Sequence, residues 1–149
     1  MYCYEILPSN VREIQNFIQK YGLKNVVVRA KGAADCTGSM FLTDDSVSSV
    51  EHLSNTGKIQ VETIPIDDDI SEPVTFIKMD IEGAEESALL GCRKKIQESH
   101  PKLALSVYHN QKDLWKLAEI VHEMDPSYKF YLRYYGGNLC PSEFILYAV

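Results

Sequence analysis

The stretch that decides the fold is Val74-Thr75-Phe76-Ile77-Lys78-Met79-Asp80-Ile81-Glu82-Gly83-Ala84-Glu85. Its first half is mostly apolar, which is typical of a strand covered on both faces. Its second half places carboxylates directly after the strand and passes into a helical pattern without an intervening loop. A buried strand that ends in acidic residues and leads at once into a helix predicts an α/β domain.

Strands and helices alternate on both sides of this stretch. The pattern predicts strands over residues 1–6, 25–28 and 103–108, and helices over residues 9–22, 84–100 and 114–124, the last with Leu114 facing inward. Two final strands, 129–134 and 144–148, flank the turn Gly136-Gly137-Asn138 and predict an antiparallel hairpin. We therefore predict a single domain over residues 1–149, with a mostly parallel, doubly wound sheet that ends in a hairpin.

The pattern is weaker between Met40 and Ile66. Short strand-like pieces at residues 40–42 and 58–64 flank a Ser- and Asp-rich segment from Asp44 to Thr56, which predicts a surface loop. The run Asp67-Asp68-Asp69 predicts a solvated turn or a helix start. We expect no metal site there, because three consecutive carboxylates do not converge easily on one cation.

Composition excludes several classes of protein. A formal charge of −6 argues against a nucleic-acid-binding surface, which needs clustered Lys and Arg. No apolar run is long enough to span a bilayer, and the N-terminal residues show no secretion signal. The four cysteines, Cys3, Cys36, Cys92 and Cys140, have neither disulfide-framework nor zinc-site spacing. We expect reduced thiols in a cytoplasmic protein without a metal site, a nucleic-acid partner or a membrane partner.

Polar residues stand where a doubly wound sheet binds its ligands, beyond the carboxyl ends of the strands. Glu5 follows the first strand, where a carboxylate either accepts the hydroxyls of a ribose or is an ordinary exposed residue. Asp80 ends the central strand and must be solvated, paired or bound to a ligand. Glu82 and Glu85 either join that site or interact with the helix dipole. His109 follows the next strand as a general base or as a helix-capping residue.

The residues from Phe76 to Glu85 resemble the signature of the FkbM-type methyltransferases, which use S-adenosylmethionine. The resemblance extends to the segments Val61 to Asp68, Pro101 to Ala104, Tyr108-His109, Asp113 to Trp115 and Tyr131 to Tyr134. It therefore covers nearly the whole chain. The resemblance implies the Rossmann-like fold of class I methyltransferases. It also implies transfer of a methyl group from S-adenosylmethionine to a hydroxyl of a sugar or another small acceptor.

The resemblance also assigns roles to individual residues. For the cofactor, Glu5 matches the residue that binds the ribose, and the loop with Gly32, Ala33 and Asp35 matches the one beside the adenine. Asp80 matches the position beside the methionine part and the acceptor. Among the candidate catalytic residues Asp80, Glu82 and His109, the base is His109 or Glu82, and Asp80 organises the pocket.

The chain departs from the family pattern at its start. Family members begin with a strand and a glycine-rich loop before the Glu-bearing strand, whereas Met1 stands four residues before Glu5. We therefore expect an N-terminally truncated member that lacks the first strand–helix unit and binds the cofactor weakly or not at all. Either the Glu5 strand closes up beside the Phe76 strand, or a homodimer covers the exposed sheet edges. The alternative function is a non-catalytic α/β module that has lost cofactor binding.

Overall fold

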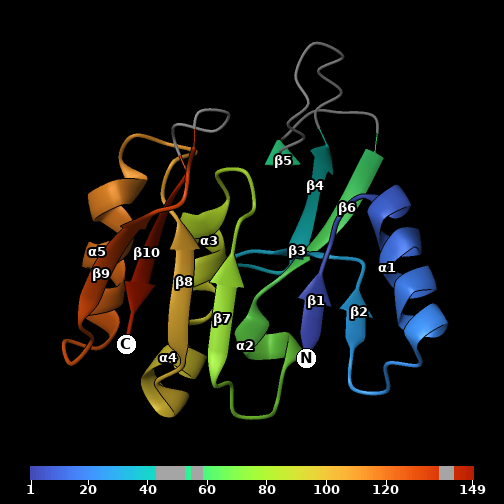
Figure 1. Ribbon diagram of the computed structural model, residues 1–149, viewed down its shortest axis with the longest axis horizontal. Coiled ribbons are helices and arrows are strands. Elements are labelled where there is room, and N and C mark those ends of the chain that lie inside the picture. The colour runs from blue at the N-terminus through green and yellow to red at the C-terminus, as the bar shows by residue number, and fades with distance from the viewer. Residues whose placement is uncertain (43–52, 55–58, 138–142) are drawn as a thin grey trace.

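A computed structural model describes residues 1–42, 53–54, 59–137 and 143–149 of the chain. Strands and helices alternate as predicted before residue 30 and after residue 65, whereas five strands follow one another between Val27 and Ile64 in the described residues. The strands form three small sheets (Figure 1). The mixed α/β class is confirmed. None of the described helices has the length and apolarity that crossing a bilayer requires.

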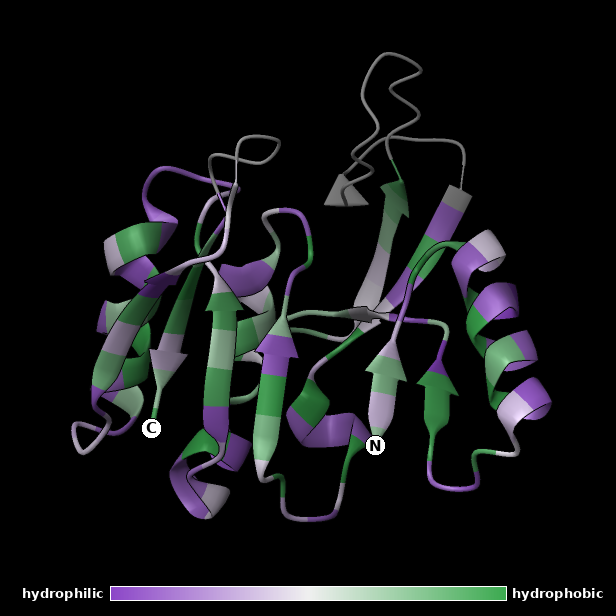
Figure 2. Ribbon diagram, viewed as in Figure 1, coloured by the Kyte–Doolittle hydropathy of each residue, from purple (hydrophilic) through white to green (hydrophobic). Residues whose placement is uncertain are grey.

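The largest core lies under the C-terminal sheet. That sheet has the order β7-β8-β10-β9, formed by Phe76–Met79, Lys102–Ser106, Phe144–Ala148 and Phe130–Tyr134. Strands β7 and β8 are parallel, and β10 runs antiparallel to both β8 and β9, which confirms the predicted hairpin. Figure 2 shows β7 and β8 as mostly apolar strands. The largest fully buried apolar side chains come from β8 and from helices α3 (Glu85–Leu90), α4 (Arg93–Ser99) and α5 (Asp113–Met124): Leu89, Ile96, Leu103, Leu105, Leu117 and Val121.

The N-terminal unit is a separate pair of parallel strands with one helix. Strand β1 (Tyr2–Tyr4) pairs with β2 (Val27–Arg29), and helix α1 (Pro8–Tyr21) connects them. Pro8 lies in the first turn, where its missing N–H costs nothing, and Gly22 ends the helix at a φ of 61°. Both helix boundaries agree with the sequence prediction.

The third sheet lies between these two parts in the sequence. Its order is β3-β6-β4-β5, formed by Gly32–Ala33, Ile59–Ile64, Gly38–Leu42 and Leu53–Ser54. Gly32 and Ala33 were expected in a loop, but they pair in parallel with Thr63 and Ile64 of β6. Helix α2 (Ile66–Asp69) confirms the predicted helix start at the aspartate run. Most of the predicted surface loop from Asp44 to Thr56 lies outside the described residues, as does Cys140.

Two details of the predicted helices were wrong. The helix after Asp80 is not continuous but divides into α3 and α4 around Gly91 and Cys92. Gly91 packs against backbone there: a Cβ atom at this position would lie 2.0 Å from the carbonyl oxygen of Ala34. In α5, Leu114 is exposed at 44% rather than turned inward. The spacing of apolar residues along a sequence shows neither where two backbone segments pack closely nor which apolar side chain is exposed to solvent.

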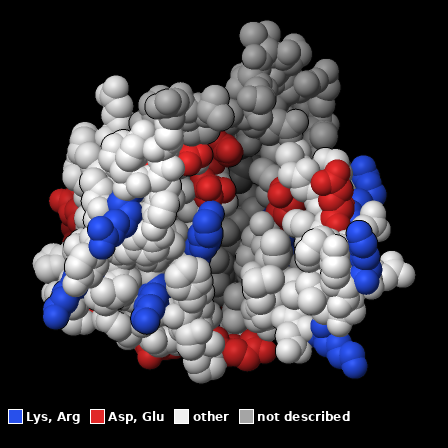
Figure 3. All heavy atoms as spheres, in the orientation of Figure 1, with Lys and Arg blue, Asp and Glu red and all other residues white. Residues whose placement is uncertain are grey.

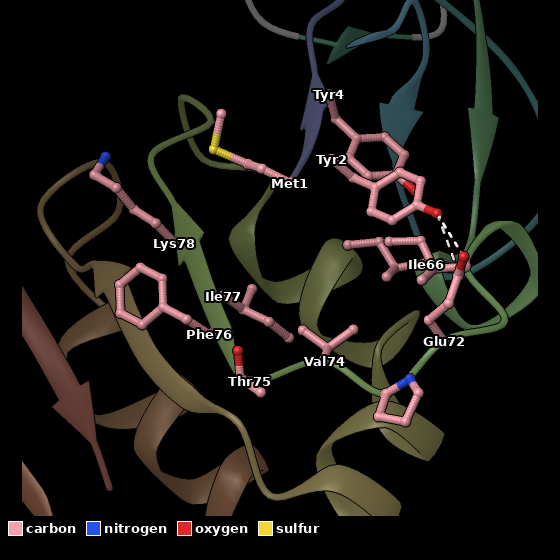
Figure 4. Close-up of a pocket in the computed structure, with 12 residues that line it drawn as sticks. Met1, Tyr2, Tyr4, Ile66, Glu72, Val74, Thr75, Phe76, Ile77 and Lys78 are labelled. Atoms are coloured by element: carbon pink, nitrogen blue, oxygen red, sulfur yellow. Dashed lines mark hydrogen bonds between the residues drawn. The ribbon is translucent and has the colours of Figure 1, made fainter. Parts of the chain in front are cut away.

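The sheet is interrupted between β1 and β7. Among the described residues β1 pairs only with β2, and β7 only with β8, so the expectation that the Glu5 strand closes up beside the Phe76 strand was wrong. A groove of about 300 Å³ lies between the two strands. Figure 4 shows Tyr2 and Tyr4 on one side, with Ile66 below them, and Phe76 and Ile77 on the other side. The homodimer that would cover these edges stays a prediction.

Asp69 of α2 links the N-terminal unit to the rest of the molecule. Its Oδ2 accepts hydrogen bonds from the hydroxyl of Tyr4 and from Nε of Arg29, each at 2.7 Å. Nearby, Glu72 accepts from the Tyr2 hydroxyl at 3.1 Å (Figure 4). Burial alone would raise the pKa of Asp69, but the hydrogen bonds from Tyr4 and Arg29 hold it below the usual value.

Replacing Asp69 by Asn is expected to lower the free energy of unfolding by about 1 kcal/mol at pH 7, because a charge-assisted contact becomes a neutral one. A carboxyl group with a depressed pKa stabilises the fold above the unfolded-state value of about 4. That contribution is lost as the pH falls through the lower folded-state pKa. Urea titrations of both proteins at pH 7 and pH 3 should show a smaller difference at the acidic pH. An equal difference at both values would contradict the assignment.

Candidate functional site

The candidate site lies beyond the carboxyl ends of β7 and β8. Because these strands are parallel, Asp80 after β7 and His109 after β8 reach the same edge of the sheet. Figure 3 shows acidic side chains gathered beside the upper part of the hollow between the two halves of the molecule. The sequence predicted a site at this edge, and the structure brings its three candidate catalytic residues together.

His109 stands at the centre of three carboxylates. Its Nε2 lies 3.2 Å from Oε2 of Glu82 and 3.6 Å from Oδ1 of Asp80. On the other side of the ring, Nδ1 lies 2.8 Å from Oε1 of Glu85. The histidine side chain is 9% exposed and that of Glu85 is fully buried. The cluster of His109 and its three carboxylates is therefore buried on the Glu85 side and open to solvent on the side of Asp80 and Glu82.

The turn between β7 and α3 holds two residues in the left-handed region. Glu82 has a φ of 56° and Gly83 a φ of 93°, conformations that cost little for glycine and more for glutamate. A Cβ atom on Gly83 would lie 3.1 Å from Nδ2 of Asn110, so the glycine also makes room for the loop after β8. The N–H of Ile81 donates to Oε1 of Glu85 at 2.9 Å and closes the turn. Local backbone conformation thus directs Glu82 toward His109.

Asp80 is held in its ionised form. The Tyr108 hydroxyl donates to its Oδ1 at 3.0 Å, and Nζ of Lys78 lies 3.3 Å from its Oδ2. Burial alone would raise the pKa of Asp80, but the hydroxyls of Ser106 and Tyr108 together with the Lys78 ammonium lower it. Burial and the hydrogen bond to Asp80 raise the pKa of Tyr108 to about 12. Tyr108 therefore remains a hydrogen-bond donor throughout the physiological pH range.

Sequence reasoning left Glu85 open between a site residue and a helix-start charge, and the structure places it beside His109. A glutamate in the first turn of a helix is explained by the helix dipole, so nothing marks this one as buried. Only the packing of α3 encloses it and places it beside His109. Asp113, by contrast, accepts from the N–H of Asn110 at 3.2 Å and from its Nδ2 at 3.0 Å. Asp113 thus holds the start of α5, and Glu85 is the buried carboxylate nearest to Nδ1 of His109.

Glu5 is engaged by its own neighbourhood. Its Oε1 accepts hydrogen bonds from the N–H groups of Ile6 and Leu7 at 2.7 and 2.9 Å, and its Oε2 accepts from Nδ2 of Asn10 at 3.2 Å. The carboxylate thereby fixes the entry into α1. A carboxylate has about four lone-pair positions, so Glu5 keeps one of them for a further donor. Its role toward a ribose stays a prediction.

The predicted adenine loop lies against α3. Gly32 and Ala33 form β3, and Ala34 is buried against Gly91. The N–H of Asp35 donates to Oγ of Ser87 at 3.1 Å, and that hydroxyl donates to Oδ1 of Asp35 at 2.9 Å. This loop is therefore fixed to the same helix that carries Glu85. Its part in cofactor binding also stays a prediction.

The residues at this edge suit the positively charged part of S-adenosylmethionine. Its sulfonium and ammonium groups need negative or electron-rich neighbours, and Asp80 and Glu82 expose 36% and 42% of their side chains. Oε2 of Glu85 is buried without a hydrogen-bond partner in the described part of the chain. The charge of the cluster thus fits a cationic ligand.

The fold is that of the class I methyltransferases, and the comparisons with known proteins agree. The methyltransferase FkbM domain matches residues 4–136. A methyltransferase FkbM from Methylobacillus flagellatus is 32% identical, with a TM-score of 0.79 over 99% of this chain. The chain belongs to the FkbM methyltransferase family. It spans 36% of the length of the Methylobacillus protein.

Two more distant structures share the fold. An rRNA methylase from Streptococcus thermophilus superposes with a TM-score of 0.61 at 14% identity, over 99% of this chain and 70% of its own. A Streptococcus mutans protein solved in complex with SAH gives a TM-score of 0.58 at 15% identity, over 99% of this chain and 73% of its own. None of the curated proteins matches the chain. At these identities, the two likenesses support the fold alone.

Proposed function

We propose that the chain forms part of an S-adenosylmethionine-dependent methyltransferase that methylates a hydroxyl group of a sugar or another small acceptor. The proposal rests on one observation: the side chains of Asp80, Glu82 and His109 lie close together beyond the carboxyl ends of the parallel strands β7 and β8. This edge of an open α/β sheet is where such folds bind their ligands. Family membership favours methyl transfer over other reactions of the same fold.

Each residue of the cluster has a distinct task in this proposal. Methyl transfer to a hydroxyl needs an oriented acceptor oxygen and the removal of one proton. His109 is the candidate base, since its ring is 9% exposed and lies beside the carboxylates of Glu82 and Glu85. Glu82 is the second candidate, being exposed and 3.2 Å from the same ring. Asp80, held by Tyr108 and Lys78, orders the pocket.

The cofactor would contact residues at the carboxyl ends of β1 and β7. Asp80 would neighbour its positively charged methionine part, and Glu5, at the end of β1, would accept from the ribose through its remaining lone pair. Asp35 and its loop would lie beside the adenine. The bound cofactor supplies an activated methyl group, and the protein supplies position and proton removal.

Titration with S-adenosylmethionine, followed by thermal unfolding, tests the proposal. We expect the melting temperature to rise with the concentration of S-adenosylmethionine, because a ligand that binds only the folded state stabilises it. A concentration ten times the dissociation constant stabilises by about 1.4 kcal/mol. Asp80→Asn should remove the rise, whereas Asp68→Asn, an exposed carboxylate on α2, should preserve it.

Other outcomes of this titration are equally informative. A clear rise at micromolar cofactor would contradict weak binding while supporting the methyltransferase site. No rise at any concentration, together with no transfer of labelled methyl groups to hydroxylated acceptors, would favour the non-catalytic module. If Asp80→Asn shows the same rise in melting temperature as the unchanged chain, Asp80 is not part of the cofactor site.

A further inference from the structure

Short contacts around His109 do not have hydrogen-bond geometry. Nδ1 lies 2.8 Å from Glu85 and Nε2 lies 3.2 Å from Glu82, yet neither ring nitrogen has a hydrogen-bond partner among the described residues. The ring is more than nine-tenths buried, and leaving buried polar atoms unpaired costs about 1–3 kcal/mol each. Oε2 of the fully buried Glu85 is unpaired as well. The ring nitrogen of His109 that carries no proton and Oε2 of Glu85 are therefore buried electron-pair donors without a partner among the described residues.

We propose that Asp80, Glu85 and His109 bind a divalent metal cation. One donor atom of each residue lies within 4.8 Å of the donors of the other two. Atoms bound to one cation at about 2.1 Å lie roughly 3 to 4 Å apart, so shifts of about 0.5 Å would close the site. Around a cation, neighbouring donors point at the metal rather than at each other. Since only one ring nitrogen can face the cation, that arrangement accounts for the close nitrogen–oxygen contact on its own side of the ring.

The donor set restricts the kind of metal. An imidazole ligand disfavours Mg²⁺ and Ca²⁺, which take oxygen ligands almost exclusively. Two carboxylates with one imidazole suit Mn²⁺ or Zn²⁺. The site differs from the aspartate run at Asp67–Asp69, because its ligands come from the end of β7, from α3 and from the loop after β8. Residues on separate elements converge on one point more readily than three consecutive ones.

The charges around the site favour a cation. Asp80, Glu82 and Glu85 carry three negative charges within reach of one histidine ring. Lys78 is the competing positive charge on Asp80, but its side chain is 58% exposed and interacts with Oδ2 alone. Oδ1 accepts one hydrogen bond from Tyr108 and keeps a second lone pair for a metal. A cation and the present partners of Asp80 are therefore compatible.

The role of the cation in methyl transfer rests on the proposed function. A metal beside Asp80 would hold the acceptor oxygen and favour loss of its proton. Glu82, 3.2 Å from the histidine ring, would then be the nearest carboxylate left to accept that proton. Metal binding itself depends only on residues of this chain, so it can be measured without cofactor or acceptor.

The test is a titration of the chain with Mn²⁺, with free Mn²⁺ measured by electron paramagnetic resonance in the absence of cofactor and acceptor. We expect one Mn²⁺ per chain, displaced by equimolar Zn²⁺ but not by excess Mg²⁺. Asp80→Asn and His109→Gln should each weaken binding at least about tenfold, as loss of a ligand does. Glu86→Gln, which changes the adjacent exposed glutamate paired with Lys112, should leave binding unchanged.

Three results would overturn the proposal: no saturable Mn²⁺ binding, equal binding by Asp80→Asn, or displacement by Mg²⁺ as readily as by Zn²⁺. Asp80 is partly exposed, so its variant should fold even if changes at buried Glu85 or His109 do not; circular dichroism checks this. If Mn²⁺ binds and S-adenosylmethionine does not, the metal site stands and the proposed function fails. If S-adenosylmethionine binds and Mn²⁺ does not, the metal site is excluded and the proposed function stands.

Discussion

Replacing Gly91 by Ala is expected to lower the free energy of unfolding by about 3 kcal/mol, at the upper end of what overpacking usually costs. The added Cβ would lie 2.0 Å from the carbonyl oxygen of Ala34 and 3.2 Å from Cα of Pro65. Both are backbone atoms, which cannot rotate away as a side chain could. For a domain of 149 residues, this loss corresponds to a fall of roughly 6–12 °C in melting temperature.

Gly137→Ala is the matched control for Gly91→Ala. A Cβ at Gly137 would meet nothing within 4 Å, and its backbone has no positive φ. Gly91 itself has a φ of −73°, so its requirement for glycine is one of space and not of conformation. Chemical unfolding of both variants should separate them clearly. Equal stability of the two would show that the chain around Ala34 moves aside at little cost.

Replacing His109 by Ala is expected to lower the rate of methyl transfer roughly 10²- to 10⁴-fold, the usual contribution of a general base. The measurement is the transfer of labelled methyl groups from S-adenosylmethionine to hydroxylated acceptors by the protein that contains this chain. A smaller effect on the Michaelis constant for the cofactor would place the loss in the chemical step. The same large loss is expected if His109 acts by holding a metal.

His122→Ala provides the control for His109→Ala, because His122 is exposed on α5 and belongs to no described ion pair. It should retain the full rate. Retention of more than a third of the rate by His109→Ala would exclude both of the roles considered for this histidine. The manganese titration then distinguishes the two roles when the loss is observed.

Local signals in the sequence predicted the parts of the fold that depend on neighbours in the chain. Pro8 and Gly22 mark the two ends of α1, and the apolar run before Asp80 marks β7. Asp80, Glu82 and His109 could be placed together because parallel strands present their carboxyl ends at one edge. Sequence order alone was sufficient for these inferences.

Features that depend on contacts across the fold could not be predicted in this way. Gly91 divides a helix because the backbone of Ala34 passes beside it. The spacing of apolar residues in the sequence does not show this contact. Glu85 has the sequence context of an ordinary helix-start residue, yet α3 buries it completely. Glu5 was predicted at a strand end, but its use in fixing the entry to α1 needs the positions of two backbone N–H groups.

The interruption of the sheet between β1 and β7 has a consequence for local stability. Helix α1 has no fully buried residue, whereas α5 buries Leu117, Ile120, Val121 and Met124. Amide protons of α1 should therefore exchange with solvent through local opening, long before those of α5, which exchange only when the core unfolds. The N-terminal unit is therefore expected to open before the core around α5, and it carries the strand whose end supplies Glu5. A ligand that bridges Glu5 and Asp80 would slow that exchange and make the two halves unfold together.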